Sequence, residues 1–234
     1  MFHKKRKNLI VAADDFGKSE LANLSILKLA KLGKLDRVSV MSDGNFAPGE
    51  IEELITTGVK LDIHLELDWQ KKRRDILKAG ALKRGINFFL NYFRADSEHR
   101  AKQVLREYED QIEKFRKIFG CLPNGINSHE YVHYFPPYFR VALELAKKFD
   151  IPYVRFAMKG ILRKKNIIGL TLIILRRLDK KIFLESGLKS SDYFSSLDWI
   201  GNTDYFLKNI PEGKTEIACH PEREEEFELV DKYF

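Results

Sequence analysis

The chain has 234 residues, a length at which α/β barrels fold as one unit, and 41 Lys and Arg against 34 Asp and Glu give a net charge of +7. With 44% hydrophobic and 32% charged residues it supports a sizeable core, which excludes a fibrous protein, a disordered chain and a membrane channel. Two cysteines are too few for a disulfide scaffold, and the scattered basic residues lack a nucleic-acid-binding motif.

Strand-like and helix-like segments alternate through the first third of the chain. Short apolar runs predict strands and a 3.6-residue apolar period predicts helices. The order is strand 9–13, helix 19–33, strand 37–41, helix 48–57 and strand 59–65. The first run is too short for a signal peptide and ends in two aspartates, which favours a strand.

The alternation resumes after an irregular, basic excursion at about residues 69–95. The segments that follow are helix 97–119, strand 124–129, helix 137–149, strand 152–156, helix 161–183 and strand 215–219. The apolar run at 167–175 is shorter than the roughly 20 residues that cross a bilayer, so we expect a cytoplasmic protein.

Repeated strand–helix units predict a parallel sheet, either open or closed into a (β/α) barrel. We favour a TIM-like, seven-stranded barrel that forms one domain over residues 1–234. Polar residues fall repeatedly at the C-terminal ends of the predicted strands, where barrel active sites lie.

Two adjacent carboxylates, Asp14 and Asp15, directly follow the first predicted strand. Carboxylates at this edge of a sheet bind a cation or act as a base. The alternative is a helix cap, because Asp near a helix N-terminus stabilises the helix by about 0.5–2 kcal/mol. The pair alone leaves both interpretations open.

Histidines follow two further strands. His64 shares one strand face with Asp62 and Glu66, and if that face points into a barrel mouth His64 is a candidate imidazole ligand. The alternative is a structural histidine. His129 and His133 lie four residues apart, the spacing that puts two ligands on one helix face. The two prolines that follow favour a strand-to-loop turn, in which only one of these histidines need bind a metal.

His220 directly follows the last predicted strand, and its neighbour Cys219 is expected to lie in the core, because adjacent strand residues face opposite ways. One carboxylate and two imidazoles with open positions for water form a common catalytic metal site. The softness of such ligands leaves zinc, iron, nickel and magnesium open.

Five short segments resemble the YdjC-like carbohydrate deacetylase family, in its order and spacing and over nearly the whole chain. They are Ala13-Asp-Asp-Phe-Gly17, His64-Leu-Glu-Leu67, Ser128-His129 with Val132-His133-Tyr-Phe-Pro136, Ser191-Asp192-Tyr193-Phe194 and Cys219-His220-Pro221.

The resemblance implies a barrel that binds one divalent metal and hydrolyses N-acetyl groups on amino sugars, either oligosaccharides or lipid-linked glycans. It names Mg²⁺, with Zn²⁺ or another transition metal as alternatives. The implied roles are metal ligands Asp15, His64 and His129, general base Asp14, general acid His220, and substrate contacts Asp192 and His133. His133 is a less favoured candidate for the general acid than His220. Its alternative role is to contact and support the metal ligands.

Three positions depart from the family pattern. This chain has Asn127, Tyr131 and Asp62 where the family has Asp, His and Gly, respectively. None is an expected ligand, so metal binding is expected to persist. Such residues orient and tune ligands, so the departures bear on the surroundings of the metal and on substrate range. An inactive member of the family is the alternative.

Two other functions fit the same residues. One is a metal-dependent ester or phosphoester hydrolase. The other is a non-catalytic barrel that contacts an anionic membrane through residues 159–183, where basic residues flank an apolar run. An ordinary barrel helix with a solvated face is the alternative for that segment, and the sequence leaves a homo-oligomer open.

Overall fold

The computed structural model describes residues 8–74, 97–162 and 167–234. The strands are β1 (Leu9–Phe16), β2 (Arg37–Val40), β3 (Lys60–Leu65), β4 (Gly125–Ser128), β5 (Gly160–Ile161), β6 (Tyr193–Ser196) and β7 (Thr215–Cys219). The α-helices are α2 (Glu20–Lys31), α3 (Glu50–Thr56), α4 (Asp68–Arg74), α6 (Ser97–Phe119), α7 (Pro136–Lys148), α8 (Ile167–Ser186), α9 (Thr203–Lys208) and α10 (Glu224–Tyr233). Two 3₁₀ helices are η1 (His129–Tyr134) and η2 (Leu197–Trp199).

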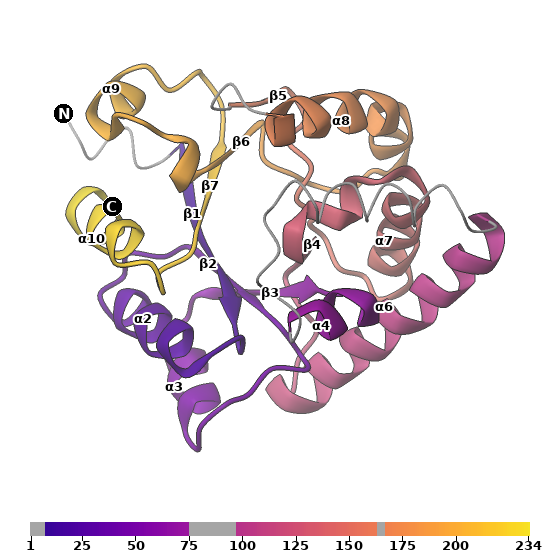
Figure 1. The fold of residues 1–234 in the computed structure, drawn as a ribbon, viewed down its shortest axis with the longest axis horizontal. Helices are drawn as coiled ribbons and strands as arrows, with labels where there is room; N and C mark the ends of the chain where they lie inside the picture. The colour runs from indigo at the N-terminus through magenta and orange to yellow at the C-terminus, as the bar shows by residue number, and fades with distance from the viewer. Residues whose placement is uncertain (1–7, 75–96, 163–166) are drawn as a thin grey trace.

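The strands form one parallel, seven-stranded sheet in the order β4-β3-β2-β1-β7-β6-β5, with helices around it (Figure 1). Val154 bridges to Ile126 of the edge strand β4, and Tyr153 bridges to Lys189, just ahead of β6. These bridges link the two sides of the sheet, which therefore curls into an incomplete barrel. The α/β barrel prediction is confirmed.

The core forms where apolar helix faces meet strands that are buried on both sides, as parallel strands usually are. Every residue of β7 is buried, and so are all but one of β1. On the other side of the barrel the rings of Phe156 and Phe183 stack with 4.4 Å between their centroids, and the Phe139 ring packs against both at a tilt. This packing fixes α7 and α8 against the sheet.

Charged residues also occupy the barrel interior, each with a partner of opposite sign. Arg37 of β2 donates to Asp62 of β3 at 2.6 Å, and Arg155 donates to Glu216 of β7 at 2.6 Å. All four side chains are buried, so each pair compensates a desolvation penalty that either charge alone could not offset. Asp62 thus has a structural partner inside the barrel.

Most predicted elements lie close to the observed ones. Ser19 caps α2 and accepts a hydrogen bond from the Ala22 backbone N–H, while α6 and β7 span the predicted residues. The prediction of one helix over 161–183 is wrong at its start, because Ile161 belongs to β5 and pairs with β6. Residues 152–156 form isolated bridges rather than a regular strand.

The predicted excursion begins with α4, and its residues 75–96 lie outside the described ranges. Within those ranges, no helix is both long enough and apolar enough to cross a bilayer.

A candidate metal centre at the C-terminal edge of the sheet

Asp14 and Asp15 reach the same region because β1 is irregular where they occur. Adjacent residues on a regular strand face opposite sides. Here the register with β2 shifts between Ala13 and Phe16, and Asp15 takes a left-handed φ of 73°. Strain of this kind persists where the surrounding structure enforces it, often at functional sites. Both carboxylates are buried at this end of the sheet.

Asp15 meets two histidines from neighbouring strand ends. Its Oδ1 lies 3.2 Å from His64 Nε2 and 3.0 Å from His129 Nδ1. Burial alone would raise the pKa of Asp15, but the hydrogen bonds to His129 and His64 outweigh burial and hold it well below the usual range. Asp15 therefore stays ionised. The His129 side chain is 20% exposed, which leaves the group open to solvent on one side.

These three side chains fit a divalent cation. One donor atom from each of Asp15, His64 and His129 lies within 4.8 Å of the others, so a single ion can contact all three. One carboxylate and two imidazoles suit zinc, iron or nickel on ligand softness, and a carboxylate also suits magnesium. The predicted ligands are thus brought together, although the geometry names no particular metal.

His64 is oriented by the adjacent strand. In the β3–β4 register His64 lies beside Asn127, and His64 Nδ1 is hydrogen-bonded to Asn127 Oδ1. Asn127 in turn donates from Nδ2 to Ser39 Oγ at 2.8 Å, which fixes its oxygen toward the imidazole. In the neutral, metal-binding form of His64 the proton therefore lies on Nδ1, and the Nε2 lone pair faces the centre. Such partners set both the tautomer and the orientation of a ligating histidine.

Lys18 occupies the second oxygen of Asp15. Its ammonium group lies 2.6 Å from Asp15 Oδ2 and 3.1 Å from Glu222 Oε1, just past β7. This contact leaves Asp15 Oδ1 as the oxygen that faces the two histidines. The Lys18 side chain is 32% exposed, and its ion pair with Asp15 places a positive charge close to the candidate metal position.

Asp14 points to a different partner, the fully buried Arg155. Two parallel hydrogen bonds join them, Arg155 Nη1 to Asp14 Oδ2 at 2.7 Å and Nη2 to Oδ1 at 2.9 Å. Burial would raise the pKa of Asp14, but Arg155 and, to a smaller extent, His64 lower it far below the usual value. Each carboxylate oxygen keeps a lone pair for a further contact. Asp14 is therefore an oriented acceptor that is ionised at neutral pH.

His220 approaches the two carboxylates from the end of β7. Its pKa is raised above 6.5, because Glu226, Asp15 and Asp14 together outweigh burial, which lowers it. Nδ1 lies 3.6 Å from Glu226 Oε2, an ion-pair distance too long for a good hydrogen bond. The backbone N–H of His220 donates to the same oxygen at 2.8 Å. The imidazole is thus held beside the centre and favoured in its protonated form.

His133 lies behind this group. It is fully buried, with Nδ1 2.7 Å from Ser128 Oγ and Nε2 2.9 Å from the Arg155 carbonyl oxygen. Burial is the main cause that lowers its pKa, to about 3, so the ring is neutral and donates from Nε2. These contacts tie the loop after β4 to the backbone of Arg155. A substrate contact for His133 stays a prediction.

Asp192 lies at the start of β6, opposite the C-terminal strand ends that carry the candidate ligands. Its carboxylate is 3.1 Å from Lys159 Nζ and accepts the Lys214 backbone N–H at 2.9 Å. The structure does not bring Asp192 to the centre. Its assignment to substrate binding stays a prediction.

An aromatic group borders the centre on the η1 side. Tyr131, with a left-handed φ of 58°, contacts the rings of Phe194 and Trp199 at centroid distances of 5.6 and 5.8 Å. Burial, followed by the charge of Asp14, raises the pKa of the Tyr131 phenol, so it stays a hydrogen-bond donor. The departure at Tyr131 therefore places a neutral hydroxyl near Asp14.

Comparison with known proteins gives concordant matches. A family model described as YdjC-like protein matches residues 8–232. The carbohydrate deacetylase of Clostridium beijerinckii is 27% identical over 91% of this chain and 80% of its own length. The chitooligosaccharide deacetylase of Escherichia fergusonii is 24% identical over 91% of this chain and 81% of its own length.

Two further matches differ in extent. The carbohydrate deacetylase of Oceanobacillus iheyensis is 28% identical over 63% of this chain, a match that spans 64% of the relative. A solved structure from Enterococcus faecalis V583, to which cellobiose-phosphate cleavage has been ascribed, superposes with a TM-score of 0.57 at 21% identity. It covers 91% of this chain and 80% of that protein, and supports the fold alone.

Proposed function

The chain belongs to the YdjC-like protein family, and we propose that it is a metal-dependent hydrolase that removes the N-acetyl group from an N-acetylated amino sugar and releases acetate. One observation carries the proposal. Asp15, His64 and His129 converge beside an ionised Asp14 and a His220 whose pKa is raised. The relatives named carbohydrate or chitooligosaccharide deacetylase supply the substrate class.

In this proposal Asp15, His64 and His129 would hold one divalent cation. When bound, the cation supplies Lewis-acid polarisation and acidifies a water. Magnesium is our choice by family resemblance, and zinc or another transition metal also fits the ligands.

Asp14 acts as the general base. The paired hydrogen bonds from Arg155 orient its carboxylate and keep it ionised. They also make it a weak base, which suits the removal of a proton only from a strongly acidified water. Asp14 therefore takes a proton from the water as the oxygen of that water attacks the acetamide carbonyl carbon.

His220 acts as the general acid. Its raised pKa favours the protonated imidazole, which donates a proton to the amide nitrogen as the carbon–nitrogen bond breaks. The products are the free amino sugar and acetate. Glu226 accepts the backbone N–H of His220 and stabilises the positive charge of its ring.

The test is acetate release by the metal-reconstituted full chain from N-acetylglucosamine oligomers and from lipid-linked N-acetyl sugars, with phosphate release measured in parallel on phosphorylated sugars. Asp14→Asn should abolish turnover and leave metal affinity unchanged, whereas His64→Ala should lose the metal by elemental analysis. Asp110→Asn, on the exposed face of α6, is the matched control. Near-normal turnover in Asp14→Asn would overturn the base, and phosphate without acetate would overturn the reaction.

A further inference from the structure

Helix α8 is apolar on its outer side as well as on the side that faces the core. Leu172, Leu175 and Phe183 are buried against the barrel. On the outer side Leu170, Ile174 and Leu178 repeat at four-residue intervals and are 47%, 49% and 64% exposed. Residues four apart on a helix are neighbours, so these three form a continuous strip, which we call the α8 strip.

Basic side chains lie among the residues of the α8 strip. Arg177, Lys180 and Lys181 are exposed on the same helix. Its two acids are Asp179, which is buried, and Glu185, which pairs with Lys181 at 3.9 Å. The outer side of α8 is therefore apolar with a positive net charge.

Arg176 is the exception among the basic residues of this helix. Its side chain is buried, and its Nη1 donates to the Met158 carbonyl oxygen at 3.0 Å. It fixes α8 to the segment that precedes β5 and is not available to a partner. Arg176 belongs by sequence to the basic residues of 159–183, but its contacts assign it to packing.

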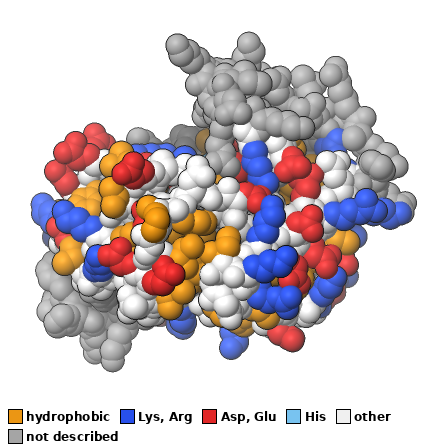
Figure 2. Space-filling model, turned by 90° about the horizontal axis from the view of Figure 1, so that it is seen from below, with side chains coloured by type: hydrophobic (Ala, Val, Ile, Leu, Met, Phe, Trp, Pro, Cys, Tyr) orange, Lys and Arg blue, Asp and Glu red, His pale blue; other side chains and the backbone are white. Residues whose placement is uncertain are grey.

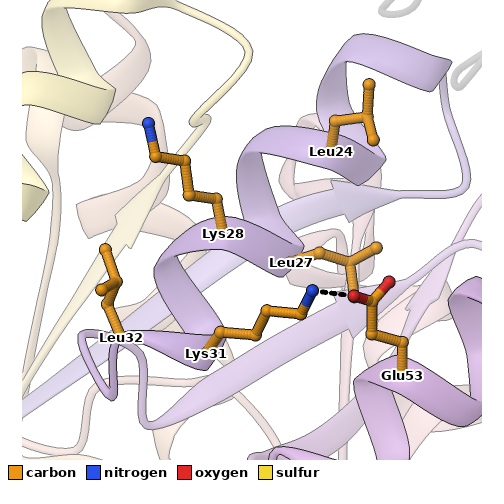
Figure 3. Close-up of a pocket in the computed structure, with 6 residues that line it drawn as sticks. All are labelled: Leu24, Leu27, Lys28, Lys31, Leu32 and Glu53. Atoms are coloured by element: carbon orange, nitrogen blue, oxygen red, sulfur yellow. Dashed lines mark ion pairs between the residues drawn. The ribbon is translucent and has the colours of Figure 1, made fainter.

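A second exposed apolar group, on α2, lacks this surplus of positive charge. Leu21 and Leu24 are 60% and 54% exposed, and Leu24 lines a groove between α2 and α3. There Lys31 is paired with Glu53 (Figure 3). Lys28 lies over the Phe227 ring of α10. On the face seen in Figure 2, hydrophobic side chains form small groups between acidic and basic ones. The α2 group thus provides a comparison in which apolar exposure comes without surplus positive charge.

The α8 strip also lies on a helix that is connected to the candidate metal centre. Helix α8 packs against η1, whose first residue is the candidate ligand His129, and lies beside β5 and α7 (Figure 1). A surface bound to α8 would therefore lie on the η1 side of the barrel.

We propose that the outer side of α8 is a membrane-contacting surface that binds anionic bilayers. The α8 strip enters the boundary between headgroups and acyl chains, and Arg177, Lys180 and Lys181 contact lipid phosphates. An apolar strip with flanking cations is the combination that holds a helix in the plane of an anionic bilayer. The consequence for substrate, that the acetylated sugar is carried on a membrane-anchored glycan, rests on the proposed function.

The test is co-sedimentation of the full chain with vesicles of phosphatidylcholine containing 30% phosphatidylglycerol, and with vesicles of phosphatidylcholine alone. The wild type should bind the anionic vesicles and lose binding as salt is raised. Arg177→Gln with Lys181→Gln should weaken binding about tenfold or more, since each cation near an anionic surface contributes separately. Ile174→Gln with Leu178→Gln should abolish it, and Leu21→Gln with Leu24→Gln is the matched control.

Three results would overturn the proposal: absence of binding to anionic vesicles, equal binding to both vesicle types, and equal loss in the α2 control. A change of sedimentation coefficient that follows the α8 substitutions without vesicles would identify a second copy of the chain as the partner instead. Acetate release from a soluble oligosaccharide should be unchanged in the α8 variants. A failure of membrane binding is thereby separated from a failure of the proposed chemistry.

Discussion

Arg155 offers the sharpest test of how the barrel interior supports the candidate site. Its side chain has no exposed surface and is ion-paired with both Asp14 and Glu216. Arg155→Met keeps most of the volume but leaves two buried carboxylates without their cation. Breaking a buried ion pair by removing one partner costs about 3–5 kcal/mol. For a chain of this size that corresponds to a fall of about 6–20 °C in Tm.

The pH dependence of this loss has a definite sign. In the wild type the pKa of Asp14 is lowered from 3.8, so its ion pair adds stability at pH values above 3.8, and that stability is lost as pH falls through the lowered pKa. In Arg155→Met burial, the largest cause, still raises the pKa of this carboxyl, while Arg155 no longer lowers it and only the weaker effects of His64 and His220 oppose burial. The difference in unfolding free energy should therefore be largest near pH 7 and should shrink as pH falls.

Urea unfolding of both proteins at several pH values between 5 and 8 measures this difference. Lys148→Met is the control, since its ion pair with Glu109 is on the surface and should contribute only about 0–1 kcal/mol. Arg155→Lys, which keeps the charge, should recover part of the loss. A pH-independent penalty, or one no larger than that of the control, would refute the coupling between Arg155 and Asp14.

Three further predictions concern the metal centre. Asn127→Leu removes the acceptor from His64 Nδ1 and should weaken metal binding about 10–100-fold, measured by isothermal titration calorimetry. His220→Gln should lower the rate of acetate release and remove its fall at alkaline pH, because the wild type loses the protonated acid as pH rises through a pKa above 6.5; an alkaline limb that survives would reject His220 as the acid. Lys18→Met frees one oxygen of Asp15 and removes a nearby positive charge, so the metal Kd should fall; weaker binding would mean that Lys18 mainly holds the carboxylate in position.

The strand ends and their polar residues are predictable from sequence because they follow short, strongly apolar runs. Asp15, His64 and His129 each come at or just past the C-terminal end of a parallel strand, and parallel strands align these ends at one edge. Sequence reasoning could therefore bring together residues that are up to 114 positions apart.

The interior ion pairs were not predictable in the same way. Arg155 lies in the segment Pro152–Phe156, where the only sequence signal of a buried ion pair is one charge within an apolar run. Nothing local indicates that its partner is Asp14, 141 residues away. The irregularity that turns Asp14 and Asp15 toward one region also depends on tertiary contacts. Strand β6 escaped prediction because only two apolar residues, Tyr193 and Phe194, precede two serines.

The pairing of β1 with β7 has a consequence for how the chain folds during synthesis. Residues Leu9–Ala13 pair with Thr215–Cys219, so the partner of the central strand β1 is translated about 200 residues after it. At ribosomal rates that delay is roughly 10 s or more. Throughout that interval one edge of an apolar strand lacks its neighbour, which is the exposure that chaperones recognise and that otherwise promotes aggregation. Strand β7, the last to leave the ribosome, thus pairs with the first strand, β1, and its folding also positions His220.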